Sequence, residues 1–394
     1  MHLRIAVLSN FYKPLISGVV TSIRLFRRGL LARGHDVHIF TTEVEDYEDD
    51  EPYIYRFPAL IDLTKAYEIS VALPLRWPMR QALKGIKPHL IHSQHPIWVG
   101  DLASKYAQEF KLPLVFTFHT RYDEYLSRNI PLLSDLAWQI THDLVQNYLE
   151  QCTHIIAPTD SIKQVLRHDY DVDAPITVLP TPIDLTLYEH LDPAPIRARY
   201  HLEGKTVLMY LGRISQEKNL ELLLRAFARL APKAPQSVLM IVGRGPHRDD
   251  LQDLARELGI EHRVIFTGAT PYDQVPHYMA AADLFTFPSL LETQALVVIE
   301  ALAAGTPVVA VHATGTDDVL AGERAGRLVQ PDEASFANAI LSLLEQPARL
   351  ADMRRAAGDI AQQYSIATAT GRLLDIYEQA IAAGPRLIKR NIFK

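Results

Sequence analysis

Short apolar segments alternate with amphipathic segments along almost the whole chain, and this alternation limits the fold more than any other feature. The first half carries six strand-length apolar segments, at residues 3–8, 36–41, 89–92, 113–118, 154–157 and 176–179. A second series follows at residues 207–211, 237–242, 263–266, 284–287 and 307–311. Strands that alternate with helices form a parallel sheet with helices on both faces. The sequence therefore predicts two doubly wound, Rossmann-like α/β domains.

The segment between the two series reads as a linker. Residues 179–185 contain Pro180 and Pro182, which block both a helix and a central strand. We therefore place the first domain at residues 1–182 and the second at 183–370, followed by residues 371–394. A helix is expected over 367–382, because Leu373, Leu374 and Tyr377 share one side. In two-domain α/β proteins the ligand binds at the carboxyl ends of the strands, so we expect the domains to face a central cleft.

Composition limits the class of protein. The 394 residues are 48% apolar and 22% charged, which is typical of a globular protein of two domains. No apolar run reaches the roughly 18 residues that a membrane span needs, and the first strand lacks the features of a signal peptide. One cysteine, Cys152, excludes an internal disulfide. We expect a cytoplasmic monomer without a nucleic-acid partner.

Charge is unevenly distributed behind the net value of -6. Residues 1–35 carry six Lys or Arg and no acid, whereas residues 43–51 hold seven carboxylates. The first helix places Arg24, Arg27 and Arg28 beside an apolar stripe, and residues 385–394 are basic. These arginines either lie on an ordinary solvated face or bind an anionic membrane surface.

Two glutamates eight residues apart lie in the segment from Phe287 to Ala310. The pattern predicts a strand at 284–287, a turn, and an apolar helix over 293–304, so Glu292 precedes the helix and Glu300 lies within it. Glu300 on an apolar face needs a partner, and a structural arginine or solvent would serve. The functional interpretation is that helix N–H groups meet a phosphate while both carboxylates accept hydrogen bonds from sugar hydroxyls.

Basic and glycine-rich segments follow the strand at 207–211 and the next one. Arg213 and Lys218 could hold a diphosphate between them, or they are ordinary surface charges. Gly243 belongs to a Val-Gly-Arg-Gly-Pro segment that lacks the spacing of a dinucleotide-binding fingerprint. In the first domain, Gly18 opens a helix and permits close backbone approach, although an ordinary turn explains it as well.

A polar cluster ends the strand at 113–118. His119 is followed by Arg121, Tyr122, Asp123 and Glu124, which favours a site at the carboxyl edge of the sheet. The histidines show no spacing typical of metal ligands. We therefore expect neither a metal nor another cofactor.

These motifs resemble, in order and spacing, the retaining family 4 glycosyltransferases of GT-B fold. The segment from Phe287 to Ala310 is the most specific part, and the resemblance spans nearly the whole chain. It implies that His119, Glu292, Arg213 and Lys218 are catalytic. It also implies that the nucleotide sugar is bound by Gly18, Gly212, Arg213, Lys218, Gly243, Thr270, Glu292, Thr293, Gln294, Ala295, Leu296 and Glu300. In the family the last helix returns to the first domain, and we expect the same here.

The chain departs from the family pattern at three places. Ala295 stands where glycine is usual, so its methyl group could crowd the donor. Asp318 replaces a longer glutamate in the segment after the next strand. Ile366 replaces the tryptophan of a Phe-Ser-Trp pattern, a change that concerns packing.

The acceptor is indicated by the first domain. The segment after His119 and the basic first helix resemble members that glycosylate diacylglycerol at a membrane surface. The resemblance implies a UDP-glucose donor, a lipid acceptor and a peripheral position at the inner face of the membrane. Acceptor or membrane contacts would come from Arg24, Arg27, Arg28, Arg121, Tyr122, Asp123 and Glu124. A soluble acceptor with a GDP-mannose or UDP-sugar donor, a non-catalytic nucleotide-sugar-binding subunit and a nucleotide-sugar epimerase remain alternatives.

Overall fold

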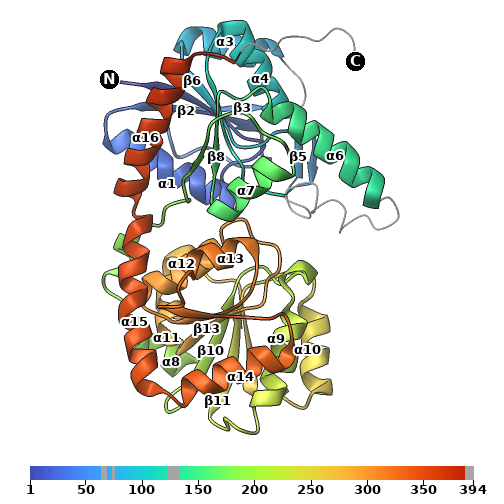
Figure 1. Ribbon diagram of the computed structural model, residues 1–394, viewed down its shortest axis with the longest axis vertical. Helices are drawn as coiled ribbons and strands as arrows, with labels where there is room; N and C mark the ends of the chain where they lie inside the picture. Colours follow the sequence, from blue (N-terminus) through green and yellow to red (C-terminus); the bar gives the residue numbers. More distant parts are fainter. Residues whose placement is uncertain (64–68, 73–75, 122–133, 387–394) are drawn as a thin grey trace. The chain divides into compact units, whose positions relative to one another are not determined.

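The computed structural model describes residues 1–63, 69–72, 76–121 and 134–386, which form two compact units (Figure 1). Unit 1 comprises Met1–Pro182 and Ile366–Lys394, and unit 2 comprises Ile183–Ser365. The chain enters unit 2 directly after Pro182, one of the two linker prolines. It returns to unit 1 at Ile366, where helix α16 (Ile366–Ala383) begins, so the predicted boundary after residue 370 falls inside this helix.

Unit 1 is built on a parallel sheet of seven strands in the order β3-β2-β1-β6-β7-β8-β9. The strands are β1 (Arg4–Leu8), β2 (Asp36–Thr42), β3 (Ile54–Phe57), β6 (Leu90–Ser93), β7 (Leu114–Thr117), β8 (His154–Ala157) and β9 (Ile176–Val178). A separate antiparallel hairpin joins β4 (Ala59–Leu63) and β5 (Ile69–Ala72).

Helices cover both faces of this sheet because the central strand is apolar on both sides. Ile5 and Val7 of β1 belong to one buried cluster, with α1 (Gly18–Ala32) and α16. Ala6 and Leu8 belong to the cluster on the other face, which is covered by α3 (Arg76–Ile86), α4 (Val99–Phe110), α6 (Ser134–Leu149) and α7 (Asp160–His168). Such two-sided burial is typical of parallel sheets.

Helix α16 returns to the first unit, as predicted, and lies against α1 (Figure 1). Arg33 donates a hydrogen bond to the carbonyl oxygen of Ala367 at 2.8 Å. A Cβ added to Gly29 would lie 2.0 Å from the Thr370 hydroxyl, so this glycine permits the close approach of the two helices.

Unit 2 repeats the architecture with six strands in the order β12-β11-β10-β13-β14-β15, all parallel (Figure 1). Its strands are β10 (Thr206–Leu211), β11 (Ser237–Val242), β12 (Val264–Gly268), β13 (Leu284–Phe287), β14 (Val308–Val311) and β15 (Gly326–Val329). Its α-helices are α8 (Ala194–Arg199), α9 (Leu220–Leu230), α10 (Arg248–Glu257), α11 (Val275–Ala281), α12 (Leu296–Ala303), α13 (Thr314–Val319), α14 (Glu333–Leu344) and α15 (Pro347–Ala361). The prediction of two doubly wound domains is confirmed, although β3, β15 and the hairpin were not predicted.

Candidate active site

Three glycines meet at the carboxyl ends of the neighbouring strands β10, β11 and β12. The amide of Gly212 donates to the carbonyl of Val242 at 3.0 Å, and the amide of Gly243 donates to the carbonyl of Gly268 at 2.9 Å. A Cβ on Gly243 would lie 1.9 Å from the oxygen of Gly212, so only glycine fits there. This edge of the sheet therefore presents backbone groups that a ligand can approach closely.

Arg213 follows Gly212 and is held by a carboxylate. Its guanidinium donates to Glu217 at 2.7 Å, and the Ser215 hydroxyl donates to the same carboxylate oxygen at 2.6 Å. Burial raises the pKa of Glu217, but the Ser215 hydrogen bond and the cations of Arg213 and Lys218 outweigh burial and hold that pKa below its ordinary value. Glu217 is therefore ionised and orients the guanidinium at the end of β10.

Lys218 and Glu292 form an ion pair with an N–O distance of 2.7 Å. The pair joins segments 74 residues apart, and the two side chains keep only 22% and 14% of their surface exposed. A diphosphate bound to Lys218 would replace the carboxylate as its partner. Glu292 would then be available to accept hydrogen bonds from sugar hydroxyls.

The segment between Glu292 and helix α12 differs from the prediction. The helix begins at Leu296 rather than Thr293, because Ala295 has a left-handed backbone with φ 55° and ψ 53°. Thr293 and Gln294 therefore lie in the preceding loop. Ala295 is 2% exposed and belongs to the buried core of unit 2. The first amides of α12 have no partner within the helix and remain suited to an anionic ligand.

Glu300 is buried within α12, with 6% of its surface exposed. Its hydrogen-bond partner is a tyrosine rather than a structural arginine: the Tyr272 hydroxyl donates to Oε1 at 3.1 Å. Burial raises the pKa of Glu300 to about 7, and the Tyr272 hydrogen bond opposes this rise. Burial raises the pKa of the Tyr188 hydroxyl, and the negative charge of Glu300 raises that pKa further. Tyr188 therefore lies near the same carboxylate.

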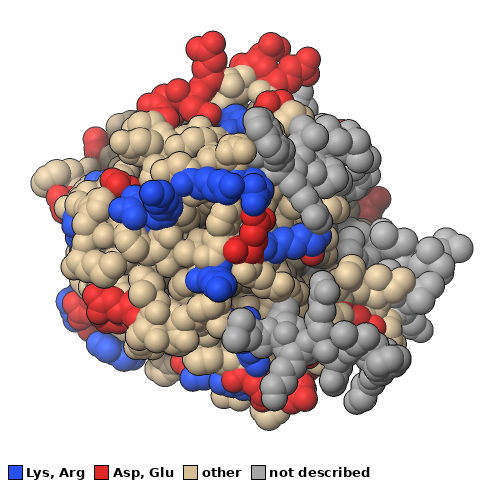
Figure 2. Space-filling view, turned by 90° about the horizontal axis from the view of Figure 1, so that it is seen from above, with Lys and Arg blue, Asp and Glu red and all other residues tan. Residues whose placement is uncertain are grey.

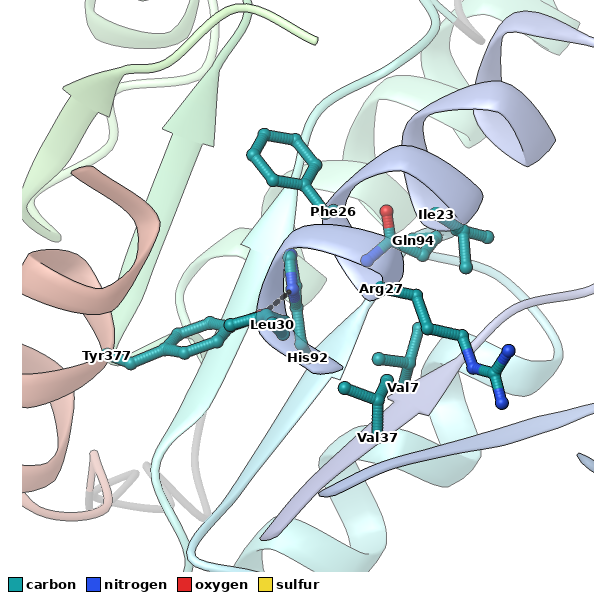
Figure 3. Close-up of a pocket in the computed structure, with 9 residues that line it drawn as sticks. All are labelled: Val7, Ile23, Phe26, Arg27, Leu30, Val37, His92, Gln94 and Tyr377. Carbon is teal, nitrogen blue, oxygen red and sulfur yellow. Dashed lines mark hydrogen bonds between the residues drawn. The ribbon is translucent and has the colours of Figure 1, made fainter. Parts of the chain in front are cut away.

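A second group of polar side chains lies at the carboxyl edge of the unit 1 sheet. His119 donates from Nε2 to the amide oxygen of Gln94 at 2.8 Å. His92 lies between the hydroxyls of Tyr377 at 2.7 Å and Thr117 at 2.8 Å, and Figure 3 shows its bond to Tyr377 of α16. Burial lowers the pKa of His119 to about 4 and that of His92 to about 3. Both rings are therefore neutral near pH 7.

Family models match both halves of the chain. Residues 16–187 match "Glycosyltransferase Family 4", and residues 194–362 match "Glycosyl transferases group 1". An alpha-monoglucosyldiacylglycerol synthase of Streptococcus pneumoniae is 31% identical over 87% of this chain and 78% of that protein. The chain belongs to glycosyltransferase family 4. It is thus a retaining glycosyltransferase, as the resemblance implied.

Other proteins that are similar to this family 4 glycosyltransferase carry different enzyme names. A D-inositol 3-phosphate glycosyltransferase of Corynebacterium kroppenstedtii is 30% identical over 98% of this chain and 91% of that protein. The sucrose-phosphate synthase of Thermosynechococcus elongatus superposes with a TM-score of 0.83 at 24% identity, covering 96% and 100% of the chains. Anabaena HepE in complex with UDP-glucose has a TM-score of 0.75 at 20% identity over 96% and 100%. The predicted GT-B fold is confirmed.

Two predicted donor contacts of this family 4 enzyme are exposed or partly exposed in the structure. Gly18 is the first residue of α1, and a Cβ added to it would meet nothing within 4 Å. Thr270 lies between β12 and the short helix of residues Tyr272–Gln274 and is partly exposed. The roles of both residues stay predictions.

Arg27 is not part of a cationic surface, which corrects the prediction for this residue. It is 6% exposed and donates to Glu51 at 2.5 Å and to the carbonyl of Pro52 at 2.7 Å. Lys13 and Tyr12 also donate to Glu51, at 2.6 and 3.0 Å. The acidic run of residues 43–51 thus packs against the basic segment of residues 1–35, although the two are separate in the sequence.

The other predicted acceptor contacts have different surroundings. Arg24 and Arg28 of α1 are exposed. Arg121 lies 3.5 Å from the carboxylate of Asp169. Tyr122, Asp123 and Glu124 lie outside the described residues.

The departures from the family pattern have structural consequences. Ala295 directs its methyl group into the core of unit 2. Burial raises the pKa of Tyr364, with a smaller contribution from Asp318, which places these two side chains near each other.

Within residues 1–63, 69–72, 76–121 and 134–386, no group of three or more His, Cys, Asp or Glu side chains could hold a metal ion.

Proposed function

We propose that this family 4 glycosyltransferase transfers glucose from UDP-glucose to the free hydroxyl of 1,2-diacylglycerol at a membrane surface, with retention of configuration. The observation that carries the proposal is that Lys218 pairs with Glu292 and that Arg213 lies near Lys218, since both cations lower the pKa of Glu217. The alpha-monoglucosyldiacylglycerol synthase relative supports the lipid acceptor, and the HepE complex with UDP-glucose supports the donor.

The residues of unit 2 bind the donor in this proposal. Arg213 and Lys218 hold the diphosphate, and Glu292 accepts from the hydroxyls of glucose. Glu300 accepts from the ribose hydroxyls. Backbone amides from Gln294 to Leu296 contact sugar and phosphate, Gly212 and Gly243 allow the close approach, and the segment containing Thr270 lies beside the base. Thr293 lies in the same donor-binding loop, between Glu292 and these amides.

The reaction proceeds by attack of the acceptor on the face that the nucleotide leaves. The bond between the anomeric carbon and the β-phosphate oxygen breaks, and a bond from that carbon to the acceptor oxygen forms. The acceptor proton passes to the departing phosphate. Arg213 and Lys218 stabilise the negative charge that develops on UDP, while His119, neutral and oriented by Gln94, contacts the reacting sugar.

Membrane attachment in this proposal is peripheral. In the part of the chain that the structure describes, no helix is long and apolar enough to cross a bilayer. Figure 2 shows Lys and Arg side chains gathered in a stripe across one face, with carboxylates beside them. The exposed cations Arg24 and Arg28 lie on α1, and Ile16, just before it, is 77% exposed. Basic groups near anionic lipid, beside an apolar side chain, favour the inner membrane surface.

Product analysis with radiolabelled UDP-glucose tests the proposal. The protein is incubated with liposomes that contain 1,2-diacylglycerol, with the same liposomes lacking it, and with inositol 3-phosphate, and a parallel series uses GDP-mannose. We expect a labelled α-glucosyl lipid only when both UDP-glucose and diacylglycerol are present. Binding to anionic liposomes should weaken as salt increases.

Each alternative has its own outcome in this assay. Label on inositol phosphate or another soluble acceptor would identify a family 4 enzyme of the soluble type. A changed sugar nucleotide without transfer would indicate an epimerase, and an unchanged donor in every mixture would indicate a binding subunit. Any of these results, in place of a glucolipid, contradicts the proposal.

A further inference from the structure

His95 carries a buried N–H group that no described residue accepts. The backbone amide of Asn10 donates to Nδ1 of this ring at 3.1 Å, so Nδ1 carries a lone pair rather than a proton. Burial, with a smaller contribution from the charge of His119, lowers the pKa of His95 to about 3, and the ring is neutral. Its proton therefore lies on Nε2. That atom is buried and has no hydrogen-bond partner in the described structure.

The loop around His95 is held firmly. The ring of Phe11 packs edge-on against the imidazole, with centroids 4.6 Å apart. The Ser93 hydroxyl donates to the carbonyl of His95 at 2.8 Å. A Cβ on Gly100 would lie 1.9 Å from the same carbonyl oxygen, so the turn into α4 closes tightly over the loop. These contacts keep the unsatisfied donor in place, and because a buried N–H without an acceptor destabilises the fold, an accepting oxygen from outside the described chain would remove that cost.

The position of His95 is that of a ligand contact. It comes two residues after β6, beside the end of β1, and lies near His119 at the end of β7, because protonation of one ring would oppose protonation of the other. The carboxyl ends of parallel strands are where α/β sheets bind their ligands. In the proposed reaction the acceptor hydroxyl must meet the sugar close to His119.

The chemistry of the group selects its partner. A neutral ring that offers only an N–H matches a neutral oxygen that only accepts, whereas a phosphate would favour a cation. In diacylglycerol the ester carbonyl at the 2-position is such an oxygen, adjacent to the reacting hydroxymethyl group. We propose, resting on the proposed function, that His95 donates its Nε2–H to this ester carbonyl and so selects diacylglycerol over dialkylglycerol.

Substrate and protein are changed together in the test. Transfer of glucose from UDP-glucose to 1,2-diacylglycerol and to the matched 1,2-dialkylglycerol, which lacks both carbonyls, is measured for the wild type and for H95N and H95Q. Asparagine keeps an acceptor for the Asn10 amide but not the distal N–H, and glutamine restores a donor near Nε2. The control is H154N, since His154 is an equally buried histidine at the amino end of β8 that bonds Thr177.

The expected preference for the diester over the diether corresponds to the free energy of one hydrogen bond to a neutral oxygen. The wild type should favour the diester about fivefold in kcat/KM. H95N should lower diester transfer to the diether rate without changing diether transfer, UDP binding or donor hydrolysis. H95Q should recover part of the preference, and H154N should keep all of it.

Two results would overturn the inference. A wild type that uses both lipids equally, or an H95N enzyme that still prefers the diester, would mean that a buried water or nothing satisfies the N–H. H95N would then lower thermal stability alone. Glucose transfer to neither lipid is a different result: it refutes the proposed function, and the inference about His95 with it.

Discussion

The carboxyl edges of the two sheets are built from opposite chemistry. The edge of unit 2 is ionic: Arg213 is held by Glu217, and Lys218 by Glu292. The buried histidines at the edge of unit 1 are neutral, because burial keeps His92, His95 and His119 uncharged, and Arg121 at this edge is paired with Asp169. Charged side chains suit a diphosphate whose charge grows during the reaction, whereas neutral donors suit an alcohol and its ester groups. The contrast therefore assigns the pH dependence to donor binding rather than to the contact with the acceptor alcohol, whereas salt should weaken both UDP binding and attachment to an anionic membrane.

The largest effect is expected from replacing Glu292 with glutamine. E292Q keeps the shape of the side chain but loses the carboxylate that accepts from the sugar and balances Lys218, so kcat should fall by about 100-fold or more. Glucose transfer and thermal unfolding are measured together, with E261Q at an exposed position as the control. Near-normal turnover in a folded E292Q protein would remove Glu292 from the mechanism.

Replacing Lys218 with methionine tests the ionic character of unit 2. Losing a charged hydrogen bond to the diphosphate should lower kcat/KM for the donor by about tenfold to 100-fold and weaken UDP binding. The apparent affinity for the lipid should stay unchanged. Calorimetric titration with UDP at two salt concentrations checks this, with exposed Lys233→Met as the control. Equal UDP affinity in K218M and wild type would contradict the assignment.

Donor binding should strengthen as the pH rises from 6 to 8. Glu300 has a raised pKa of about 7, so it is mainly protonated at pH 6 and mainly ionised at pH 8. The ionised form accepts both ribose hydroxyls, so UDP affinity should increase by about tenfold over this range. Titrations of the wild type and E300Q check the sign: E300Q should be flat. A pH-dependent increase of the same size in E300Q would exclude this carboxylate as its source.

A smaller effect is expected from Y272F. The Tyr272 hydroxyl stabilises the ionised carboxylate, so its removal should move the midpoint of the pH dependence upward. UDP affinity at pH 7 should fall by a few-fold, about the value of one hydrogen bond. The control is Y278F, which removes a hydroxyl paired with Tyr200 elsewhere in unit 2. A midpoint that stays in place would show that Tyr272 does not act on Glu300.

Central strands were predictable because burial on two faces demands an apolar run. Strand β10 is fully buried from Val207 to Tyr210 and could be read directly from the sequence. The two strands missed from the main sheets, β3 and β15, lie at sheet edges, are only four residues long and are each interrupted by an arginine. An edge strand has a partner on one side only, so its sequence needs less apolar character.

Site residues were predictable where motif and strand end coincide, and their partners were not. Glu292, Arg213 and Lys218 lie in segments that follow strands, and Glu300 lies in the helix after β13, so their positions near the edge could be expected. Tyr272 reaches Glu300 across 28 residues, and the register of different strands brings such pairs together. The Arg27–Glu51 ion pair was missed for the same reason, since the acidic run alone does not indicate which cations it meets.

Unit 1 is assembled from both ends of the chain, which affects the order in which the protein can mature on the ribosome. Helix α16 supplies Leu373, Ile376 and Tyr377 to the cluster under α1, and Tyr377 is a partner of His92. Because synthesis runs from the amino end, unit 2 is complete before this helix emerges. The nascent first unit must therefore wait for the last few dozen residues with one apolar face uncovered, and a chain truncated there would leave that face exposed to chaperones and proteases.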